Sequence, residues 1–224
     1  MAALTLDRWN LAIGDGHPLV VIAGLNVLED AALALDTGRH LKAVCAELGL
    51  PYVFKASFDK ANRSSIVSYR GPGLEEGLSV LGEVKRQLAI PICTDLHTPE
   101  QAEPVAAVAD IVQIPAFLCR QTDLVVAAAR ATRAAGGWLH VKKGQFLAPW
   151  DCRNIRDKIG EAAPGAPFTI FCERGVSFGY NNLIVDMLAI EEMKALGTPV
   201  TIDATHAVQL PGADPRTNSA STGG

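Results

Sequence analysis

The regular alternation of short apolar runs with helical patterns is the feature of this 224-residue sequence that most limits its fold. Each run is nearly continuous, as expected of a parallel strand with both faces buried. Strands are predicted at Leu19–Ala23, Tyr52–Ala56, Ile90–Thr94, Ile111–Ile114, Leu139–Lys142, Phe168–Cys172 and Val200–Asp203. Apolar residues at helical spacing predict helices at Asp30–Leu48, Leu74–Leu88, Pro99–Val108, Leu124–Ala135, Asn154–Ala162 and Leu183–Leu196. Strand–helix alternation of this kind produces a parallel sheet.

The number and spacing of these units favour one α/β barrel over a doubly wound open sheet. At least seven units of about 25–30 residues follow one another without a break in composition. We therefore predict a single (β/α)8 TIM-barrel domain over residues 1–224, with about seven of the eight units present. Residues 1–16 are predicted to form an N-terminal β-hairpin that covers the amino-terminal mouth, with Gly14–Asp15–Gly16 as its turn.

The stretch Val53–Gly73 begins as a strand and becomes polar at once. It carries the cations Lys55, Lys60, Arg63 and Arg70 among serines and an asparagine, with Asp59 as its only acid. A solvated strand normally mixes both signs of charge, so this composition favours a site that holds phosphate or carboxylate by charge-assisted hydrogen bonds. A basic surface loop is the alternative interpretation.

Polar groups follow every predicted strand at its carboxyl end, where barrel enzymes build their active sites. They are Asn26, Lys55, Lys60, Asp95, His97, Gln113, Lys142, Lys143, Glu173, Arg174, Asp203 and His206. The converging cations indicate a polyanionic ligand such as a sugar phosphate or phosphoenolpyruvate, and His206 and Asp95 are candidates to move protons. A divalent ion on His206, Glu173 and Asp203 stays an open possibility that no ligand spacing supports.

Composition and charge argue against several classes of function. The formal net charge is −4 and no basic run contains interleaved aromatics, so no nucleic-acid partner is expected. No apolar run reaches the ~18 residues of a membrane span, and the N-terminus lacks the pattern of a signal peptide. The five cysteines include no CxxC pair, which argues against a zinc ribbon or a disulfide framework. A reducing, cytoplasmic compartment is expected.

Several long segments resemble 3-deoxy-D-manno-octulosonate 8-phosphate synthases over about Pro18 to Gly212. They are KANRSS (60–65), RGPGLEEGL (70–78), TDLH (94–97), QIPAFLCRQTDL (113–124), VKKGQF (141–146), ERGVSFGYNNLIVDM (173–187) and DATHAVQLPG (203–212). The resemblance implies a (β/α)8 barrel assembled as a homotetramer. It also implies condensation of phosphoenolpyruvate with arabinose 5-phosphate for lipopolysaccharide synthesis.

The resemblance also implies roles for individual residues. The phosphoenolpyruvate site would comprise Lys60, Gln113, Ala116, Lys142 and Arg174. The arabinose 5-phosphate site would comprise Asn62, Arg63 and Ser64, with Arg120 from a neighbouring subunit. Catalytic groups around the reacting carbons would be Asn26, Lys55, Asp95, His206 and Gln209.

No cofactor and no metal are expected. Metal-dependent members of the resembled family carry cysteine at the residue that closes the segment Gly24–Asn26, and a thiolate binds transition metals strongly. This sequence has Asn26 there, and a neutral amide is a poor ligand.

Two alternatives stay open from the sequence. The first is the sister synthase that uses erythrose 4-phosphate, against which KANRSS and the pair Asn181–Asn182 argue. The second is a paralogue that binds sugar phosphate without turnover or serves as an assembly subunit. An assay of phosphate release with both aldoses would separate the three.

The C-terminal segment carries one further expectation. The resembled family continues beyond the seventh strand with a helix, an eighth strand and a final helix, which supply a glutamate and an aspartate near the catalytic histidine. Neither acid can be matched here, and residues 213–224 are polar and rich in Gly, Ser and Thr, as in a mobile loop or tail. We therefore expect residues 1–224 to be an incomplete version of the enzyme, poorly stable and inactive if the chain ends at Gly224.

Overall fold

Seven parallel strands form the sheet around which the chain folds. The computed structural model describes residues 3–209, so the predicted tail at 213–224 lies outside the described residues. The strands lie in the order β11-β8-β7-β6-β5-β4-β3, and all neighbours are parallel. Their bounds are β3 (Val21–Gly24), β4 (Tyr52–Lys55), β5 (Ile92–Asp95), β6 (Ile111–Ile114), β7 (Trp138–Lys142), β8 (Thr169–Glu173) and β11 (Val200–Ile202). The seven predicted strands are confirmed, each within two residues of its predicted bounds.

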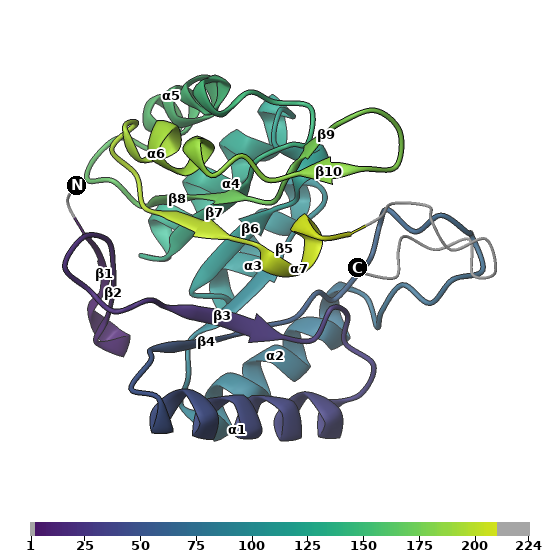
Figure 1. Cartoon of the computed structure of the whole chain (residues 1–224). Helices are drawn as coiled ribbons and strands as arrows, with labels where there is room; N and C mark the ends of the chain where they lie inside the picture. The colour runs from purple at the N-terminus through teal and green to yellow at the C-terminus, as the bar shows by residue number, and fades with distance from the viewer. Residues whose placement is uncertain (1–2, 210–224) are drawn as a thin grey trace.

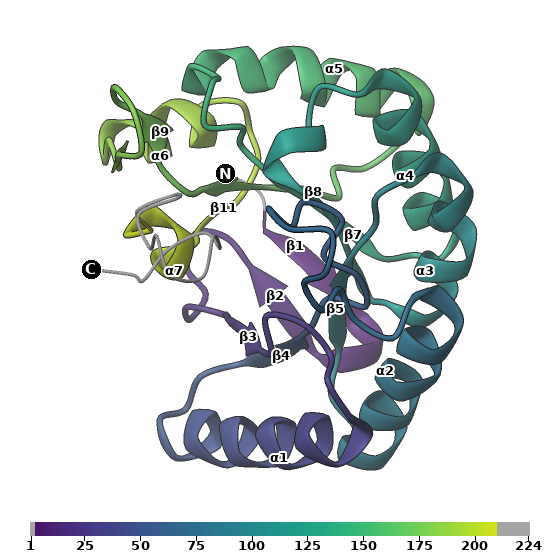
Figure 2. The same ribbon diagram turned by 90° about the vertical axis from the view of Figure 1, so that its right-hand side faces the viewer.

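A helix follows each strand, and the helices cover the outside of the curled sheet. Figure 2 shows α1 to α5 as an arc around the strands, viewed onto the carboxyl ends. Within residues 3–209, β3 and β11 are the two edge strands of this sheet. The helices are α1 (Ala31–Glu47), α2 (Leu74–Leu88), α3 (Ala102–Val108), α4 (Thr122–Ala134), α5 (Cys152–Ala162), α6 (Leu188–Lys194) and α7 (Ala204–Ala207). The predicted barrel architecture with about seven β/α units is therefore confirmed. Among the described residues, no helix is both long and apolar enough to cross a membrane.

Burial on both faces explains why the strand sequences lack alternation. Every residue of β5 and of β6 is buried, as the continuous apolar runs predict. Helix α2 instead buries one side, with Leu78, Leu81 and Val84 against the sheet. Its close approach depends on Gly77, where an added Cβ would lie 2.3 Å from the Cβ of Phe58.

The N-terminal hairpin lies across the amino-terminal ends of the strands. Strand β1 (Leu4–Leu6) pairs with β2 (Leu11–Ile13), and a short 3-10 turn at Asp7–Trp9 connects them. The predicted turn at Gly14–Gly16 is therefore wrong, because Asn10 takes the left-handed conformation at φ 48° and reverses the chain earlier. The Trp9 indole donates to buried Asp110 at 2.7 Å, which fixes the hairpin against the start of β6.

One predicted helix is partly wrong. The segment Leu183–Leu196 becomes helical only at Leu188, where the Asp186 carboxylate accepts the backbone N–H at 3.0 Å. Residues Leu183–Ile184 instead form β10, which pairs antiparallel with β9 (Val176–Ser177). Helical spacing of apolar residues did not reveal this small hairpin, because two-residue strands carry no period of their own.

The segments that follow the strand ends gather at one end of the barrel. At the right of Figure 1 lie the long segment between β4 and α2, the β9–β10 hairpin and α7. The candidate functional residues belong to this end.

Candidate active site

A cavity of about 190 Å³ opens at the carboxyl ends of the strands. Its walls come from residues at or after the ends of β4, β5, β6, β7, β8 and β11. The lining residues with a predicted role are Lys55, Lys60, Asn62, Asp95, Gln113, Ala116, Lys142, Arg174 and His206. The structure therefore brings together most of the residues that the sequence placed at a single mouth.

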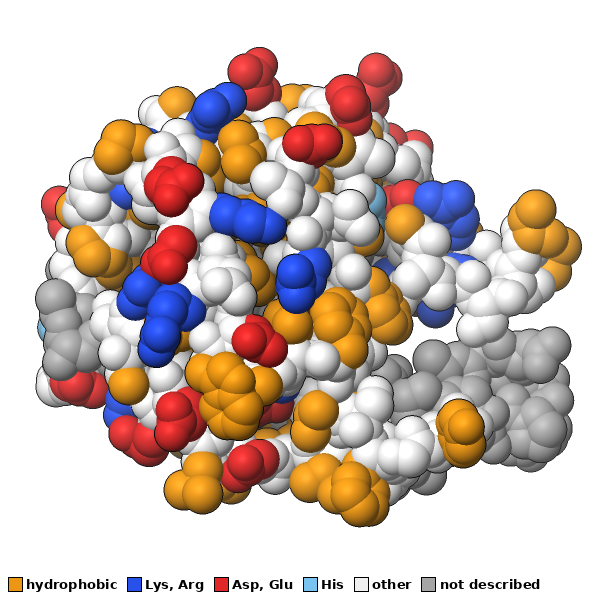
Figure 3. Space-filling view, turned by 90° about the horizontal axis from the view of Figure 1, so that it is seen from above, with side chains coloured by type: hydrophobic (Ala, Val, Ile, Leu, Met, Phe, Trp, Pro, Cys, Tyr) orange, Lys and Arg blue, Asp and Glu red, His pale blue; other side chains and the backbone are white. Residues whose placement is uncertain are grey.

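Among the described residues, three lysines and one arginine line this cavity. Lys55 and Lys142 are the last residues of β4 and β7, Arg174 directly follows β8, and Lys60 lies in the segment after β4. Lys55 and Lys60 both donate to the Ser57 hydroxyl, at 2.9 and 3.0 Å. On the outer face seen in Figure 3, by contrast, acidic and basic side chains are interspersed. The concentration of cations at the mouth favours a ligand with several negative charges.

Among these four cations, Lys60 has the most strongly lowered pKa. Burial lowers its pKa to about 7, and the neighbouring positive charge of Lys55 acts in the same direction more strongly than Asp95 opposes it. At neutral pH the Lys60 amine is thus about half protonated, and a bound anion would favour the charged form.

Asp95 at the end of β5 is the carboxylate of the cavity wall. Its oxygens lie 3.8 Å from the Lys55 Nζ and 3.3 Å from the His97 Nε2. Burial alone would raise the pKa of Asp95, but the charge of Lys55 and the hydrogen bond from His97 lower it well below its ordinary value. Asp95 is therefore ionised at neutral pH, where it orients both neighbours.

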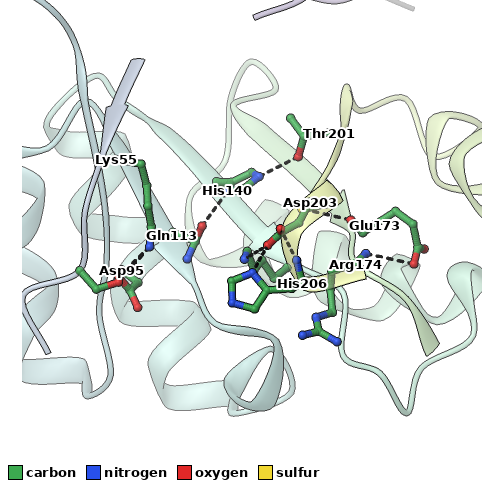
Figure 4. Close-up of polar contacts among 12 residues, drawn as sticks. Lys55, Asp95, Gln113, His140, Glu173, Arg174, Thr201, Asp203 and His206 are labelled. Carbon is green, nitrogen blue, oxygen red and sulfur yellow. Dashed lines mark hydrogen bonds and ion pairs between the residues drawn. The ribbon is translucent and has the colours of Figure 1, made fainter. Parts of the chain in front are cut away.

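His206 is held by Asp203 at the start of α7. One Asp203 oxygen accepts the backbone N–H of His206 at 2.9 Å, and the other lies 2.7 Å from the His206 Nδ1 and also contacts the Lys142 ammonium (Figure 4). The hydrogen bond to Asp203 raises the pKa of His206, whereas burial and the charge of Lys142 lower it. The lowering effects together are larger, so the pKa of His206 lies below its ordinary value. A neutral ring with its proton on Nδ1 leaves Nε2 as a proton acceptor near the cavity.

The backbone of Arg174 is held by Glu173, which also forms a buried ion pair. The preceding residue, Glu173, accepts the backbone N–H groups of Arg174 at 3.0 Å and of Gly175 at 2.6 Å. Its other oxygen lies 3.5 Å from the Lys143 Nζ, and both side chains are almost fully buried. Lys142 and Arg174 thus line the cavity, while Lys143 and Glu173 are paired within the protein.

A polar cluster of His140, Gln113 and Thr201 lies beneath the cavity wall. The His140 ring in β7 lies 3.3 Å from the Gln113 Oε1 through Nδ1 and 2.8 Å from the Thr201 hydroxyl through Nε2. Burial lowers the pKa of His140 to about 3, with the charge of Lys142 adding to the effect. This imidazole is neutral at any pH at which the protein is expected to work.

Comparison with known proteins identifies the family. Residues 3–220 match the model of the DAHP synthetase I family. The 2-dehydro-3-deoxyphosphooctonate aldolase of Shewanella amazonensis is 54% identical over 212 residues, which cover 95% of this chain and 73% of the relative. The enzyme of the same name from Hahella chejuensis is 53% identical over 95% of this chain and 73% of its own length. That from Trichlorobacter lovleyi is 53% identical over 92% of this chain and 74% of its own length.

The chain belongs to the DAHP synthetase I family, among its 2-dehydro-3-deoxyphosphooctonate aldolases. The cationic mouth described above is therefore the candidate active site of a member of this family. The resemblance identified from the sequence motifs is confirmed at the level of the family.

In this family member, five predicted site residues lie outside the cavity lining. They are Asn26, Arg63, Ser64, Arg120 and Gln209. Asn26 is exposed two residues after β3. The Arg63 Nε donates to the Tyr69 carbonyl at 3.0 Å, within its own loop. The Gln209 backbone N–H donates to the His206 carbonyl at 3.2 Å.

The cations of the stretch Val53–Gly73 fall into two kinds, those that line the cavity and those that bind within the loop. Lys55 and Lys60 line the cavity, whereas the Arg70 guanidinium forms two hydrogen bonds with Asp59, at 2.8 and 2.5 Å. Arg70 therefore serves the loop conformation. Sequence reasoning grouped these cations, and no signal in the stretch separates the two kinds.

His140 and Thr201 are two polar residues beneath the cavity that sequence reasoning missed, and Gln145 in the cavity lining is a third. His140 and Thr201 both lie inside strands that were interpreted as apolar, and they are 61 positions apart. A histidine in the middle of WLHVK was the available signal, because a buried polar side chain in a strand needs a partner. Within the part of the chain that the structure describes, no group of three or more His, Cys, Asp and Glu side chains is arranged to hold a metal ion.

Proposed function

We propose that this chain condenses phosphoenolpyruvate with D-arabinose 5-phosphate and water. The products are 3-deoxy-D-manno-octulosonate 8-phosphate, a precursor of lipopolysaccharide, and inorganic phosphate. The observation that carries the proposal is the convergence of Lys55, Lys60, Lys142 and Arg174 on one cavity. The three relatives described above, each more than half identical to this chain, carry the name 2-dehydro-3-deoxyphosphooctonate aldolase.

Phosphoenolpyruvate is proposed to occupy the part of the cavity formed by Lys60, Gln113, Ala116, Lys142 and Arg174. Its carboxylate and phosphate carry charges that the two lysines and the guanidinium would neutralise. Binding two phosphate esters side by side requires this many cations, since the two substrates otherwise repel each other. Holding them in attack geometry contributes up to ~7–11 kcal/mol to lowering the barrier.

In the proposed reaction, the methylene carbon of phosphoenolpyruvate attacks the aldehyde carbon of the sugar, whose oxygen takes a proton. Water then adds to the resulting cationic carbon, and phosphate leaves by cleavage of the carbon–oxygen bond. Neutral His206 is suited to accept the proton of that water, and Asp95 holds Lys55 next to the reacting carbons. Asn26 and Gln209 are proposed to complete this set.

Arabinose 5-phosphate is proposed to bind Asn62, Arg63 and Ser64, of which Asn62 lines the cavity. Arg120 is exposed in the segment between η3 (Ala116–Leu118) and α4, where a neighbouring copy can contact it. We propose a homotetramer in which Arg120 completes the sugar-phosphate site of the next subunit. Light scattering on the purified protein should give four copies, and a monomer with full sugar-phosphate affinity would contradict this.

The reaction is proposed to need neither metal nor cofactor. Asn26 stands at the position that would supply a thiolate ligand in metal-dependent members of the family, and its amide is a poor ligand for transition metals. Activity should survive treatment with a chelator. Loss of activity on chelation, restored by manganese or cadmium, would overturn this proposal.

A cytoplasmic location is proposed from the cysteines. All five are free thiols, and all are buried. Free thiols persist in reducing compartments.

The deciding assay measures phosphate release from phosphoenolpyruvate with two aldoses in parallel. Arabinose 5-phosphate should support release and yield the eight-carbon product by mass spectrometry, whereas erythrose 4-phosphate should not. Turnover with erythrose 4-phosphate instead would identify the sister activity. Binding of both substrates without phosphate release would indicate a sugar-phosphate-binding protein.

A further inference from the structure

His140 is a buried polar residue with no assigned role in the proposed reaction. It lies in the middle of β7 and is 4% exposed. The register pairs Gln113 of β6 with His140, so the two side chains emerge on the same face of the sheet. The ring then reaches the Thr201 hydroxyl on β11 (Figure 4), so it spans the inside of the curled sheet beneath the cavity.

The protonation state of this ring determines what Gln113 presents to the cavity. A neutral imidazole has one N–H donor and one acceptor nitrogen. If Nδ1 carries the proton, it donates to the Gln113 Oε1, and the amide NH2 is left for the cavity. If Nε2 carries the proton, Nδ1 must accept from the Gln113 NH2, and the carbonyl oxygen is left for the cavity.

The contact with Gln113 distinguishes the two forms. The atom of Gln113 that faces Nδ1 is Oε1, at 3.3 Å, and a carbonyl oxygen can only accept, so Nδ1 carries the ring proton. Unprotonated Nε2 then accepts from the Thr201 hydroxyl at 2.8 Å, a shorter contact than the 3.3 Å from that hydroxyl to the Phe171 carbonyl.

We infer that His140 is a positioning residue that fixes the Gln113 amide with its NH2 group toward the cavity. Two N–H donors there complement Lys60, Lys142 and Arg174 around a carboxylate or phosphate. The reversed amide would place a carbonyl oxygen against the same anion. The ligand, phosphoenolpyruvate, rests on the proposed function, whereas the ring form and the amide orientation do not.

The first test reads the ring form directly. The ring signals of ¹⁵N-histidine-labelled protein separate the two neutral forms, and the His140→Asn variant identifies the His140 signals among the five histidines. A proton on Nδ1 with unprotonated Nε2 is expected from pH 5 to pH 9. A proton on Nε2, or a charged ring in that range, would overturn the inference whether or not the protein binds phosphoenolpyruvate.

The second test compares two amide substitutions by calorimetric titration with phosphoenolpyruvate. The asparagine of His140→Asn can place an NH2 where Nδ1 lies and still donate to Gln113, whereas the glutamine of His140→Gln reaches the Nε2 position instead. We expect His140→Asn to bind within about threefold of wild type and His140→Gln to bind about tenfold more weakly, the loss of one charge-assisted hydrogen bond. Thermal melts confirm that each variant is folded.

Equal affinities of the two folded variants would overturn the positioning role. If His140→Gln does not fold, Gln113→Leu replaces it in the comparison and must show the same tenfold loss. Failure of the wild-type protein to bind phosphoenolpyruvate would refute the proposed function, and the ring form would still decide the inference.

Discussion

Replacing Lys60 with arginine should remove the pH dependence of phosphoenolpyruvate binding above neutral pH. Burial and the adjacent Lys55 charge lower the Lys60 pKa to about 7. An anionic ligand favours the protonated lysine, so the pKa rises in the complex. Above pH 7 the free protein must therefore take up one proton in order to bind.

The magnitude follows from that pKa. The protonated fraction falls from about one half at pH 7 to about one hundredth at pH 9, and a tenfold fall corresponds to ~1.4 kcal/mol of binding free energy. Affinity at pH 9 should thus be about 50-fold weaker than at pH 7. Arginine remains charged throughout this range, so the Lys60→Arg protein should show no such decline.

Calorimetric titration in two buffers of different ionisation enthalpy measures the proton uptake directly. At pH 8.5 wild type should take up about one proton, and Lys60→Arg none. Lys158→Arg on the outer helix α5 is the matched control and should behave as wild type. A flat wild-type affinity between pH 7 and 9, or an undiminished slope in Lys60→Arg, would refute the reasoning.

Three further substitutions test the surroundings of the site. Asp110→Ala should lower the free energy of unfolding in urea by about 3–5 kcal/mol, because the Trp9 indole N–H and the buried Ile92 backbone N–H lose their acceptor and Lys85 loses its ion pair. Asp36→Ala on the surface should change it by less than ~0.5 kcal/mol. Glu173→Ala should lower the free energy of unfolding by about 3–5 kcal/mol, because Lys143 is left buried and unpaired. Glu173→Gln should lower it less, because the glutamine oxygen still accepts the backbone N–H groups, and equal losses would contradict this. Arg63→Ala should weaken arabinose 5-phosphate binding by roughly 1.5–3 kcal/mol in calorimetry, and an unchanged affinity would remove Arg63 from the site.

The sheet could be predicted from the sequence because burial alone determines its pattern. Apolar runs that are buried on both faces located all seven strands, and α2 was predicted at its observed bounds from one apolar side. The turn of the N-terminal hairpin could not be predicted in the same way. Gly14 and Gly16 carry the stronger local turn signal, yet Leu4, Leu6 and Leu11 pack against the barrel only when the chain reverses at Asn10.

The candidate site could be predicted as a set of strand ends but not as a set of contacts. Parallel strands bring their carboxyl ends to one edge, which placed Lys55, Lys142 and Arg174 together. Which cation of a loop faces inward depends on its local partner, as Arg70 with Asp59 shows. Partners between distant strands depend on register and curvature, which short apolar runs do not encode.

The sheet explains how four cations remain close together without a ligand. Lys55 and Lys142 end hydrogen-bonded strands, so their backbones cannot move apart to relieve repulsion. Asp95 and Asp203 offset part of the charge through Lys55 and Lys142, but Lys60 and Arg174 have no carboxylate within ion-pair distance in the described residues. The cavity therefore holds excess positive charge in a fixed geometry, and burial lowers the pKa of both unpaired cations. A ligand with several negative charges removes this imbalance without requiring the protein to rearrange, which is the condition for strong electrostatic stabilisation of a transition state.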